Sequence, residues 1–187
     1  MYLSKIMSEY YFDIETYSTT PRPNPLQDKV ITIQYQRLGS ATGRIEEDLQ
    51  ILTEKEYGSE EKLLEKFKEI FITDNNFDFI PIGVNLYGYD FIVLMNKFKQ
   101  YFGQDLTVEF LRNRPVIDLK STLVMMNGGK FGGYNQLLGK KQSGNVIREL
   151  YEKNDWDGIL NYIKDEAKNF VEKYQVIKRE LTNIKLS

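Results

Sequence analysis

The chain contains 187 residues, of which 41% are hydrophobic and 28% charged, and its formal net charge is −2. This composition is typical of a globular protein, and no apolar run reaches the roughly 20 residues that span a bilayer, so we expect no membrane insertion. Cysteine and histidine are absent, which excludes disulfides, thiolate or histidine metal sites, and Ser-His-Asp or Cys-His triads. The first residues lack the pattern of a secretory signal, and we expect an intracellular, cytoplasmic protein.

The first predicted strand covers residues 10–16, with the sequence YYFDIET. In an extended chain Asp13 and Glu15 share one face, while Phe12 and Ile14 point the other way into a core. Two carboxylates on one face repel each other unless a cation lies between them, and a site built from carboxylates alone favours Mg²⁺ or Mn²⁺. The alternative is an edge strand with a solvated polar face.

Two more strands are expected after a loop at residues 18–28, which contains three prolines. Residues 29–38 alternate β-branched and polar side chains, and residues 44–52 form a plausible third strand that closes an antiparallel meander. Ser59 is a predicted N-cap for an amphipathic helix that ends near Phe71.

A short apolar stretch at residues 79–84 is expected to form a buried strand beside the first one. Asn85 follows this strand, and Asp90 falls in the first turn of the next predicted helix. Functional groups gather at the carboxyl ends of strands in α/β sheets, although an Asp near a helix N-terminus is also an ordinary stabilising choice.

The last third of the chain is predicted to be mainly helical. After a possible short strand at residues 115–120, we expect short helices at 134–138 and 146–151 and a long helix at 156–181. An apolar stripe marks the long helix: Ile159, Ile163, Phe170 and Tyr174. Asp165 shares a face with Asn161 and Tyr162, which on an ordinary surface helix is simply a solvated face.

Charge is unevenly distributed along the chain. Residues 112–148 carry seven basic side chains (Arg112, Arg114, Lys120, Lys130, Lys140, Lys141 and Arg148) and one acidic side chain, Asp118. With the aromatic residues Tyr87, Tyr89, Phe131 and Tyr134, this segment could track a nucleic-acid backbone and stack bases; a solvated surface with chance clustering is the alternative.

Three short motifs together resemble the exonuclease motifs of the DEDD superfamily of 3′–5′ exonucleases, in particular the proofreading domain of family-B DNA polymerases and its stand-alone relatives. They are FDIET at residues 12–16, NLYGYD at 85–90 and YIKD at 162–165. The resemblance covers about residues 8–180. It implies an RNase H-like α/β fold, with a mixed sheet of about five strands and flanking helices, and one exonuclease-like domain across residues 1–187 with its motifs between 10 and 166.

The resemblance also implies the roles of individual residues. Two Mg²⁺ or Mn²⁺ ions would be held by four carboxylates, and Asp13 would bridge the ions; the set is Asp13, Glu15, Asp90 and Asp165. Contacts to the terminal nucleotides would come from Thr16, Asn85 and Tyr89. The implied reaction is hydrolysis of phosphodiester bonds from the 3′ end of single-stranded DNA, with RNA as an alternative substrate.

One position departs from the family pattern. The family places a water-orienting tyrosine four residues before the last Asp, where this chain has Asn161, and Tyr162 lies one position later. A related subclass has histidine five residues before that Asp, where this chain has Leu160. We expect Asn161 to line the site and Tyr162 to face it partly, with the metal ions activating the water.

Two classes of function stay open at this stage. The chain is either a 3′–5′ exonuclease or a catalytically weak or inactive nucleic-acid-binding accessory module with the same fold. Four retained carboxylates favour the enzyme, because a binding module has no need for four negative charges beside phosphate.

Overall fold

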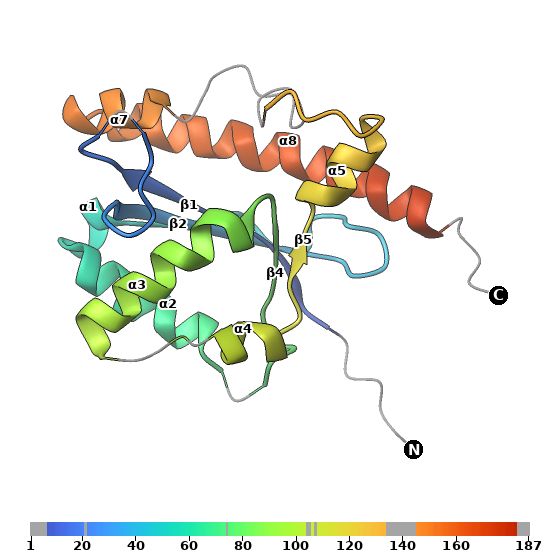
Figure 1. The fold of residues 1–187 in the computed structure, drawn as a ribbon, viewed down its shortest axis with the longest axis horizontal. Coiled ribbons are helices and arrows are strands. Elements are labelled where there is room, and N and C mark those ends of the chain that lie inside the picture. Colours follow the sequence, from blue (N-terminus) through green and yellow to red (C-terminus); the bar gives the residue numbers. More distant parts are fainter. Residues whose placement is uncertain are drawn as a thin grey trace.

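The computed structural model describes residues 7–20, 22–73, 75–103, 106, 108–133 and 145–182. A five-stranded sheet lies between two groups of helices, with α2, α3 and α4 against one face and α5, α7 and α8 against the other (Figure 1). The strands are β1 (Glu9–Tyr17), β2 (Lys29–Leu38), β3 (Gln50–Thr53), β4 (Ile80–Gly83) and β5 (Ile117–Asp118). The helices are α1 (Glu54–Tyr57), α2 (Glu60–Phe71), the π-helical turn η1 (Leu86–Asp90), α3 (Phe91–Phe102), α4 (Val108–Asn113), α5 (Lys120–Met126), α7 (Asn145–Glu152) and α8 (Trp156–Thr182).

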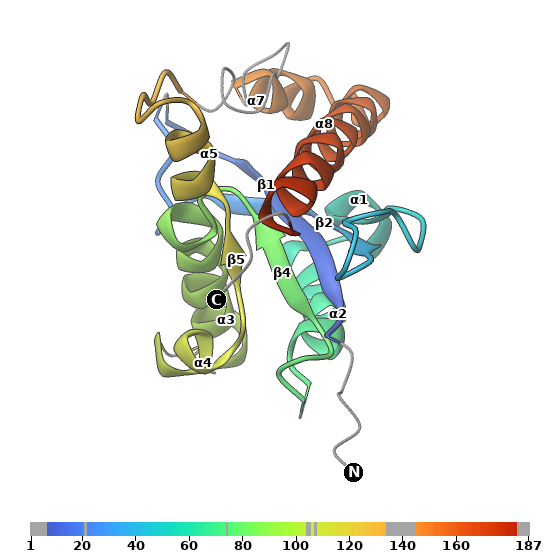
Figure 2. The same ribbon diagram turned by 90° about the vertical axis from the view of Figure 1, so that its right-hand side faces the viewer.

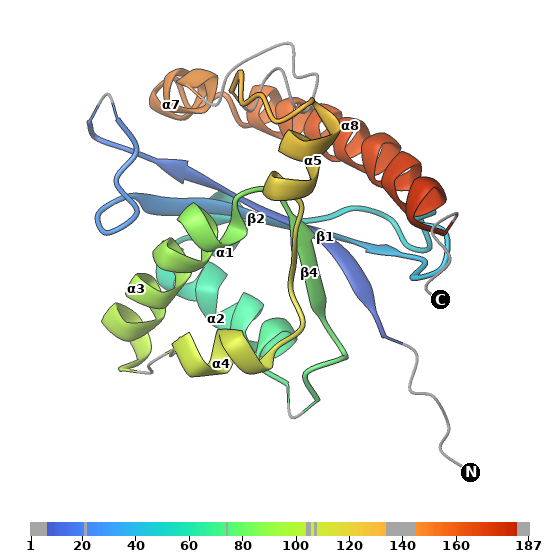
Figure 3. The ribbon, with the colours of Figure 1, turned by 45° about the vertical axis from the view of Figure 1, so that its right-hand side comes forward.

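The strand order is β3-β2-β1-β4-β5, with β2 antiparallel to β1 and to β3, and with β4 parallel to both β1 and β5. This mixed sheet, flanked by helices, confirms the predicted RNase H-like α/β fold. Figure 2 shows α8 crossing above β1 and β4. Figure 3 shows α2, α3 and α4 below the sheet, with α8 above it.

The alternation of side chains along β1 separates two cores. Phe12 and Ile14 pack with α2 and α3, whereas Tyr11 packs with α5 and α8. The carboxylates of Asp13 and Glu15 therefore share the face covered by α8, because side chains two residues apart point the same way. A β-bulge follows Glu15, since Glu15 pairs with Thr32 while the next residue of β1 pairs with Val30, and Ile31 is left as the extra residue.

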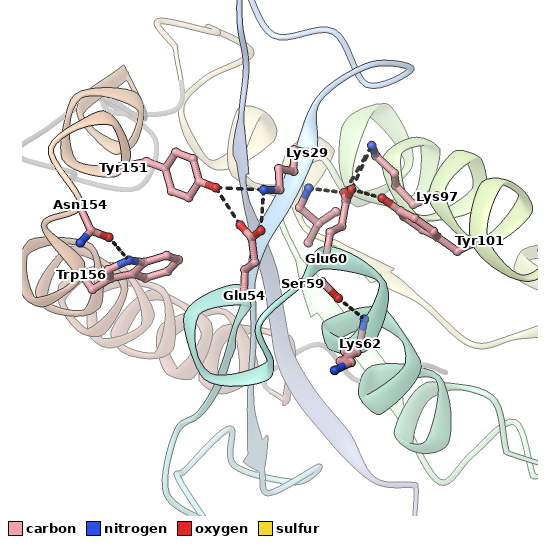
Figure 4. A network of polar contacts seen from close by, with 11 residues as sticks. Lys29, Glu54, Ser59, Glu60, Lys62, Lys97, Tyr101, Tyr151, Asn154 and Trp156 are labelled. Atoms are coloured by element: carbon pink, nitrogen blue, oxygen red, sulfur yellow. Dashed lines mark hydrogen bonds and ion pairs between the residues drawn. The ribbon is translucent and has the colours of Figure 1, made fainter.

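The first residue of β2 is held by a polar cluster between α1 and α7 (Figure 4). Lys29 Nζ forms an ion pair with Glu54 and donates to the Tyr151 hydroxyl at 3.0 Å. Tyr151 in turn donates to Glu54 Oε2 at 2.8 Å. These contacts tie α7 to the strand that pairs with the end of β1.

A second carboxylate fixes the same end of β2 from the opposite face of the sheet. Glu60 of α2 accepts a hydrogen bond from the Val30 backbone N–H at 2.6 Å and another from the Tyr101 hydroxyl at 2.7 Å. It also forms a buried ion pair with Lys97 at 3.3 Å (Figure 4). The ends of β1 and β2, where Glu15 lies, are thus anchored by side chains from both helical layers.

Several sequence predictions lie outside the described residues. These are the short helix expected at 134–138, the aromatic Tyr134, and Lys140 and Lys141 of the basic segment. Among the helices that the structure describes, none combines the length and the apolar composition needed to cross a membrane.

Candidate active site

Three carboxylates meet on the α8 side of the sheet. Asp13 and Glu15 of β1 and Glu166 of α8 each offer an oxygen atom, and these atoms all lie within 4.8 Å of one another. Asp13 and Glu15 are half-buried, and Glu166 is 9% exposed. The two residues that the sequence placed on one face of the first strand are therefore brought together with a third acid.

The helix α8 reaches this cluster because every fourth residue of one stripe faces β1. Phe170 packs against Tyr11 with ring centroids 4.8 Å apart, and Tyr174 donates to Glu9 at 2.7 Å. Four residues before Phe170 the same stripe presents Glu166 above Asp13 and Glu15. The contacts run in opposite directions along the two elements, so α8 is antiparallel to β1.

Asp165, predicted as the fourth carboxylate, does not lie in this cluster. Its side chain is exposed, and Glu166 takes the inward position. Successive helical residues are about 100° apart, so only one of two neighbouring acids can face the sheet. This corrects the expected placement of Asp165. Asn161, also expected at the site, is exposed as well.

Tyr162 lies close to the Glu166 side chain, four residues further along α8. The sequence motif was expected to have a tyrosine four residues before its last acid. Tyr162 has this spacing when Glu166, and not Asp165, is taken as that acid. Burial is the main cause that raises the pKa of Tyr162, and the charges of Glu15 and Glu166 raise it further. Its hydroxyl consequently stays protonated beside the carboxylates.

A second tyrosine lies beneath the cluster. Tyr11 is buried, and its hydroxyl donates to Asp13 Oδ2 at 3.4 Å. Burial is the main cause that raises its pKa well above the usual value, and the Asp13 charge adds to it. Like Tyr162, it stays protonated beside the acids.

Asp90 reaches the same region from the other side of β1. It ends the π-helical turn η1 after β4 and is only 4% exposed. Burial raises its pKa well above the usual value, and the nearby Asp13 charge is the next cause. β4 can approach this closely because Gly83 has no side chain, since a Cβ there would lie 2.6 Å from the Phe12 carbonyl oxygen.

Asp118, at the end of β5, organises the backbone between β4 and η1. Its carboxylate accepts from the backbone N–H groups of Asn85 at 2.9 Å, Tyr87 at 3.2 Å and Lys120 at 3.0 Å. Asn85 has a left-handed backbone (φ 68°), and its Oδ1 accepts from Lys120 Nζ at 2.8 Å. Gly88 leaves room for the Asn85 side chain, which a Cβ would touch.

Thr16 and Tyr89, both predicted to contact substrate, contact each other. The Tyr89 hydroxyl donates to the buried Asp28 at 2.6 Å and lies 2.7 Å from Thr16 Oγ1. Because Asp28 takes the tyrosine proton, Thr16 is the donor in the second bond. Burial, followed by the hydrogen bond to Asp28, raises the pKa of Tyr89.

Exposed aromatic side chains flank Asn85. Tyr87 is 49% exposed and Phe131 51% exposed. Lys120 Nζ lies 5.7 Å from the centre of the Phe131 ring and 2.8 Å from Asn85 Oδ1, which places a positive charge between that ring and the Asn85 amide. Of the aromatic residues predicted to stack bases, Tyr87 and Phe131 have accessible rings.

No family model and no curated protein matches the chain. Solved structures of exonuclease I are similar to it, and one aligns at 16% identity over 65% of this chain and 29% of that chain, with a TM-score of 0.48. E. coli exonuclease I in complex with a dT13 oligonucleotide aligns at 15% identity over 65% and 29%, with a TM-score of 0.48. The zinc-bound E. coli exonuclease I–ssDNA complex aligns at 15% identity over 66% and 30%, with a TM-score of 0.49. The chain thus spans less than a third of the length of these proteins. The resemblance to the family-B proofreading domain stays a prediction.

Glu166 is the functional candidate that the sequence did not single out. A signal was present, because Glu166 lies three residues after Ile163 and four before Phe170, inside the apolar stripe of α8. A charged residue within such a stripe indicates a buried polar contact.

Proposed function

We propose that the chain is a metal-dependent 3′–5′ exonuclease that hydrolyses phosphodiester bonds from the 3′ end of single-stranded DNA. The observation that carries the proposal is the cluster of Asp13, Glu15 and Glu166, whose oxygen atoms lie within 4.8 Å of one another. The buried Asp90 adds a fourth acid, which lies at the end of the turn that follows β4. Like charges gathered in this way call for a cation.

The donor set fits two hard divalent ions, since Mg²⁺ and Mn²⁺ prefer carboxylate oxygens. We propose that Asp13, Glu15 and Glu166 would hold one ion, and that Asp13 and Asp90 would support the other. Such a pair, when bound, activates a water molecule and stabilises the leaving 3′ oxygen. Asp165 is left out of this set because it is exposed.

The surrounding residues position the acids and the substrate. The protonated Tyr162 hydroxyl, close to Glu166, would orient that carboxylate by donating to it. Lys120 supplies a positive charge beside Asn85, which suits a phosphate of the DNA backbone. The exposed rings of Tyr87 and Phe131 offer faces on which unpaired bases stack without reading their sequence.

Degradation of single-stranded DNA labelled at either end tests this function. We expect products shortened from the 3′ end in Mg²⁺ or Mn²⁺ and none with a chelator. Asp13→Asn should abolish cleavage while the protein stays folded, because the change removes one of several repelling charges. DNA binding should weaken as salt rises, since counterion release contributes much of the affinity.

Two results would count against the proposal. Binding of single-stranded DNA without metal-dependent cleavage would favour the accessory module. Shortening from the 5′ end would leave the metal site in place but reverse the proposed polarity of the substrate.

A further inference from the structure

Gln34 is a buried amide in the middle of β2, with 0% of its surface exposed. Its Nε2 is buried too, and it makes no hydrogen bond within the described part of the chain. Leaving a buried donor without an acceptor costs about 1–3 kcal/mol, so such a group in a core needs a reason.

The strand register places this amide at the carboxylate cluster. Gln34 is the direct partner of Asp13 across the β1–β2 pair, and Thr32 is the partner of Glu15. Side chains directly opposite each other in an antiparallel pair share a face, with Cβ atoms about 4.5–5.5 Å apart. Gln34 therefore belongs to the face of the sheet on which Asp13, Glu15 and Glu166 meet.

Thr32 determines which end of the amide is available. Its hydroxyl donates to Gln34 Oε1 at 3.0 Å, so the oxygen is engaged along β2 and Nε2 is left as the donor. The reversed amide would present its oxygen to three carboxylates, an electrostatically unfavourable arrangement. Both considerations favour an N–H group turned toward the acids.

We infer that Gln34 is a positioning residue of the proposed metal site: its Nε2, which has no partner among the described residues, would donate to the Asp13 carboxylate once a cation is bound and fix the orientation of that carboxylate as a ligand. This inference rests on the proposed function. A carboxylate that gives one oxygen to a cation keeps lone pairs for a further donor, and such outer contacts set the geometry of the ligand. Tyr11 already donates to Asp13 Oδ2 from below, and Gln34 would supply a second donor from the neighbouring strand.

Mn²⁺ titration of the metal-free full chain by calorimetry tests the inference without relying on activity. Gln34→Met keeps the length of the side chain and removes the donor. We expect its Mn²⁺ affinity to fall by about tenfold or more, the scale typical of lost outer-shell partners. The matched control is Gln36→Met, because Gln36 lies on the same face of β2 and donates to the Glu47 carbonyl at 3.2 Å, away from the acids. It should lose stability and keep the wild-type affinity.

A second variant keeps the test valid should Gln34→Met fold poorly. Thr32→Val combined with Gln34→Met replaces both bonded partners by apolar groups of similar shape, which is close to neutral for folding. Wild-type Mn²⁺ affinity in the folded variants would overturn the inference and leave the proposed function intact. Absence of Mn²⁺ binding to the wild-type chain would overturn both. Failure of both variants to fold would assign Gln34 to the core and also overturn the inference.

Discussion

The buried carboxylates at the two ends of the contact between α8 and β1 have opposite electrostatic surroundings. At one end, Glu9 accepts from the Tyr174 hydroxyl at 2.7 Å and pairs with Lys178 at 2.8 Å. At the other end, three turns back along the helix, Glu166 is brought against two more acids. One helix thus supplies a cation to the first carboxylate and a further negative charge to the others.

The difference separates a contact that stabilises the fold from one that suits a ligand. Glu9 is almost fully buried, and its interactions with α8 compensate the loss of its hydration. Gathering Asp13, Glu15 and Glu166 stores repulsion that a bound cation relieves. We therefore expect variants at the two ends to affect different measurements.

The largest effect should come from Glu166. Glu166→Gln removes one proposed ligand and should lower the cleavage rate on the order of a thousandfold, since the loss falls on charge stabilisation in the transition state. The stability of the metal-free protein should stay equal or rise. Asp165→Asn is the matched control on the same helix, and single-turnover cleavage should be close to wild type. The reverse ranking of the two variants would reinstate Asp165 as the ligand.

A variant at the Glu9 end of the contact should change the stability of the protein rather than its activity. Lys178→Met leaves the buried Glu9 carboxylate without its cation, and urea unfolding should show a loss of about 2–4 kcal/mol. Cleavage by the folded variant should be unchanged. Lys168, which is exposed on the same helix, provides a control, because Lys168→Met should change stability by less than about 0.5 kcal/mol. Equal losses in both variants would remove the distinction between the two ends.

Tyr162 should have an intermediate effect on activity. Tyr162→Phe removes the hydroxyl beside Glu166 and should lower cleavage by roughly 10- to 100-fold. Asn161→Ala changes an exposed side chain and should leave the rate unaltered. Normal cleavage by Tyr162→Phe together with slow cleavage by Asn161→Ala would instead give the water-orienting role to Asn161.

The smallest effect concerns the pH dependence of stability. The raised pKa of Asp90 means that the folded, metal-free chain holds this proton to a higher pH than the unfolded chain does. Stability is therefore full below a pH of about 4 and falls as the pH rises toward the folded pKa. Asp90→Asn should remove this loss, so it should stabilise the metal-free chain at pH 7 and leave its stability unchanged at pH 4. Thermal unfolding across this range in a chelator measures the effect. A gain that does not depend on pH would show that Asp90 is not the titrating group.

The sequence predicted the positions of helices and strands better than it predicted which side chains of a helix face the sheet. The strand at residues 29–38 agrees with β2, and Ser59 caps α2 as expected, because alternation and capping are local properties. Whether Asp165 or Glu166 faces the sheet depends on how α8 packs, and a difference of one residue changes the direction of a side chain by about 100°.

Other features of the site need tertiary information altogether. Gln34 becomes a candidate only when the register pairs it with Asp13, a contact between residues 21 positions apart in sequence. Likewise, Tyr89 is an unremarkable aromatic residue until the fold brings Asp28 and Thr16 to its hydroxyl.

The π-helical turn at Leu86–Asp90 has a consequence for comparing related chains. A π-turn holds one residue more than an α-helical turn, and such insertions often occur at functional sites. Deleting one residue between Asn85 and Asp90 would restore the α-helical spacing and rotate the Asp90 side chain by about 100° relative to β4. The number of residues in this segment thus sets the direction of the Asp90 side chain. An alignment that opens a gap here would pair Asp90 with a residue that cannot occupy its place.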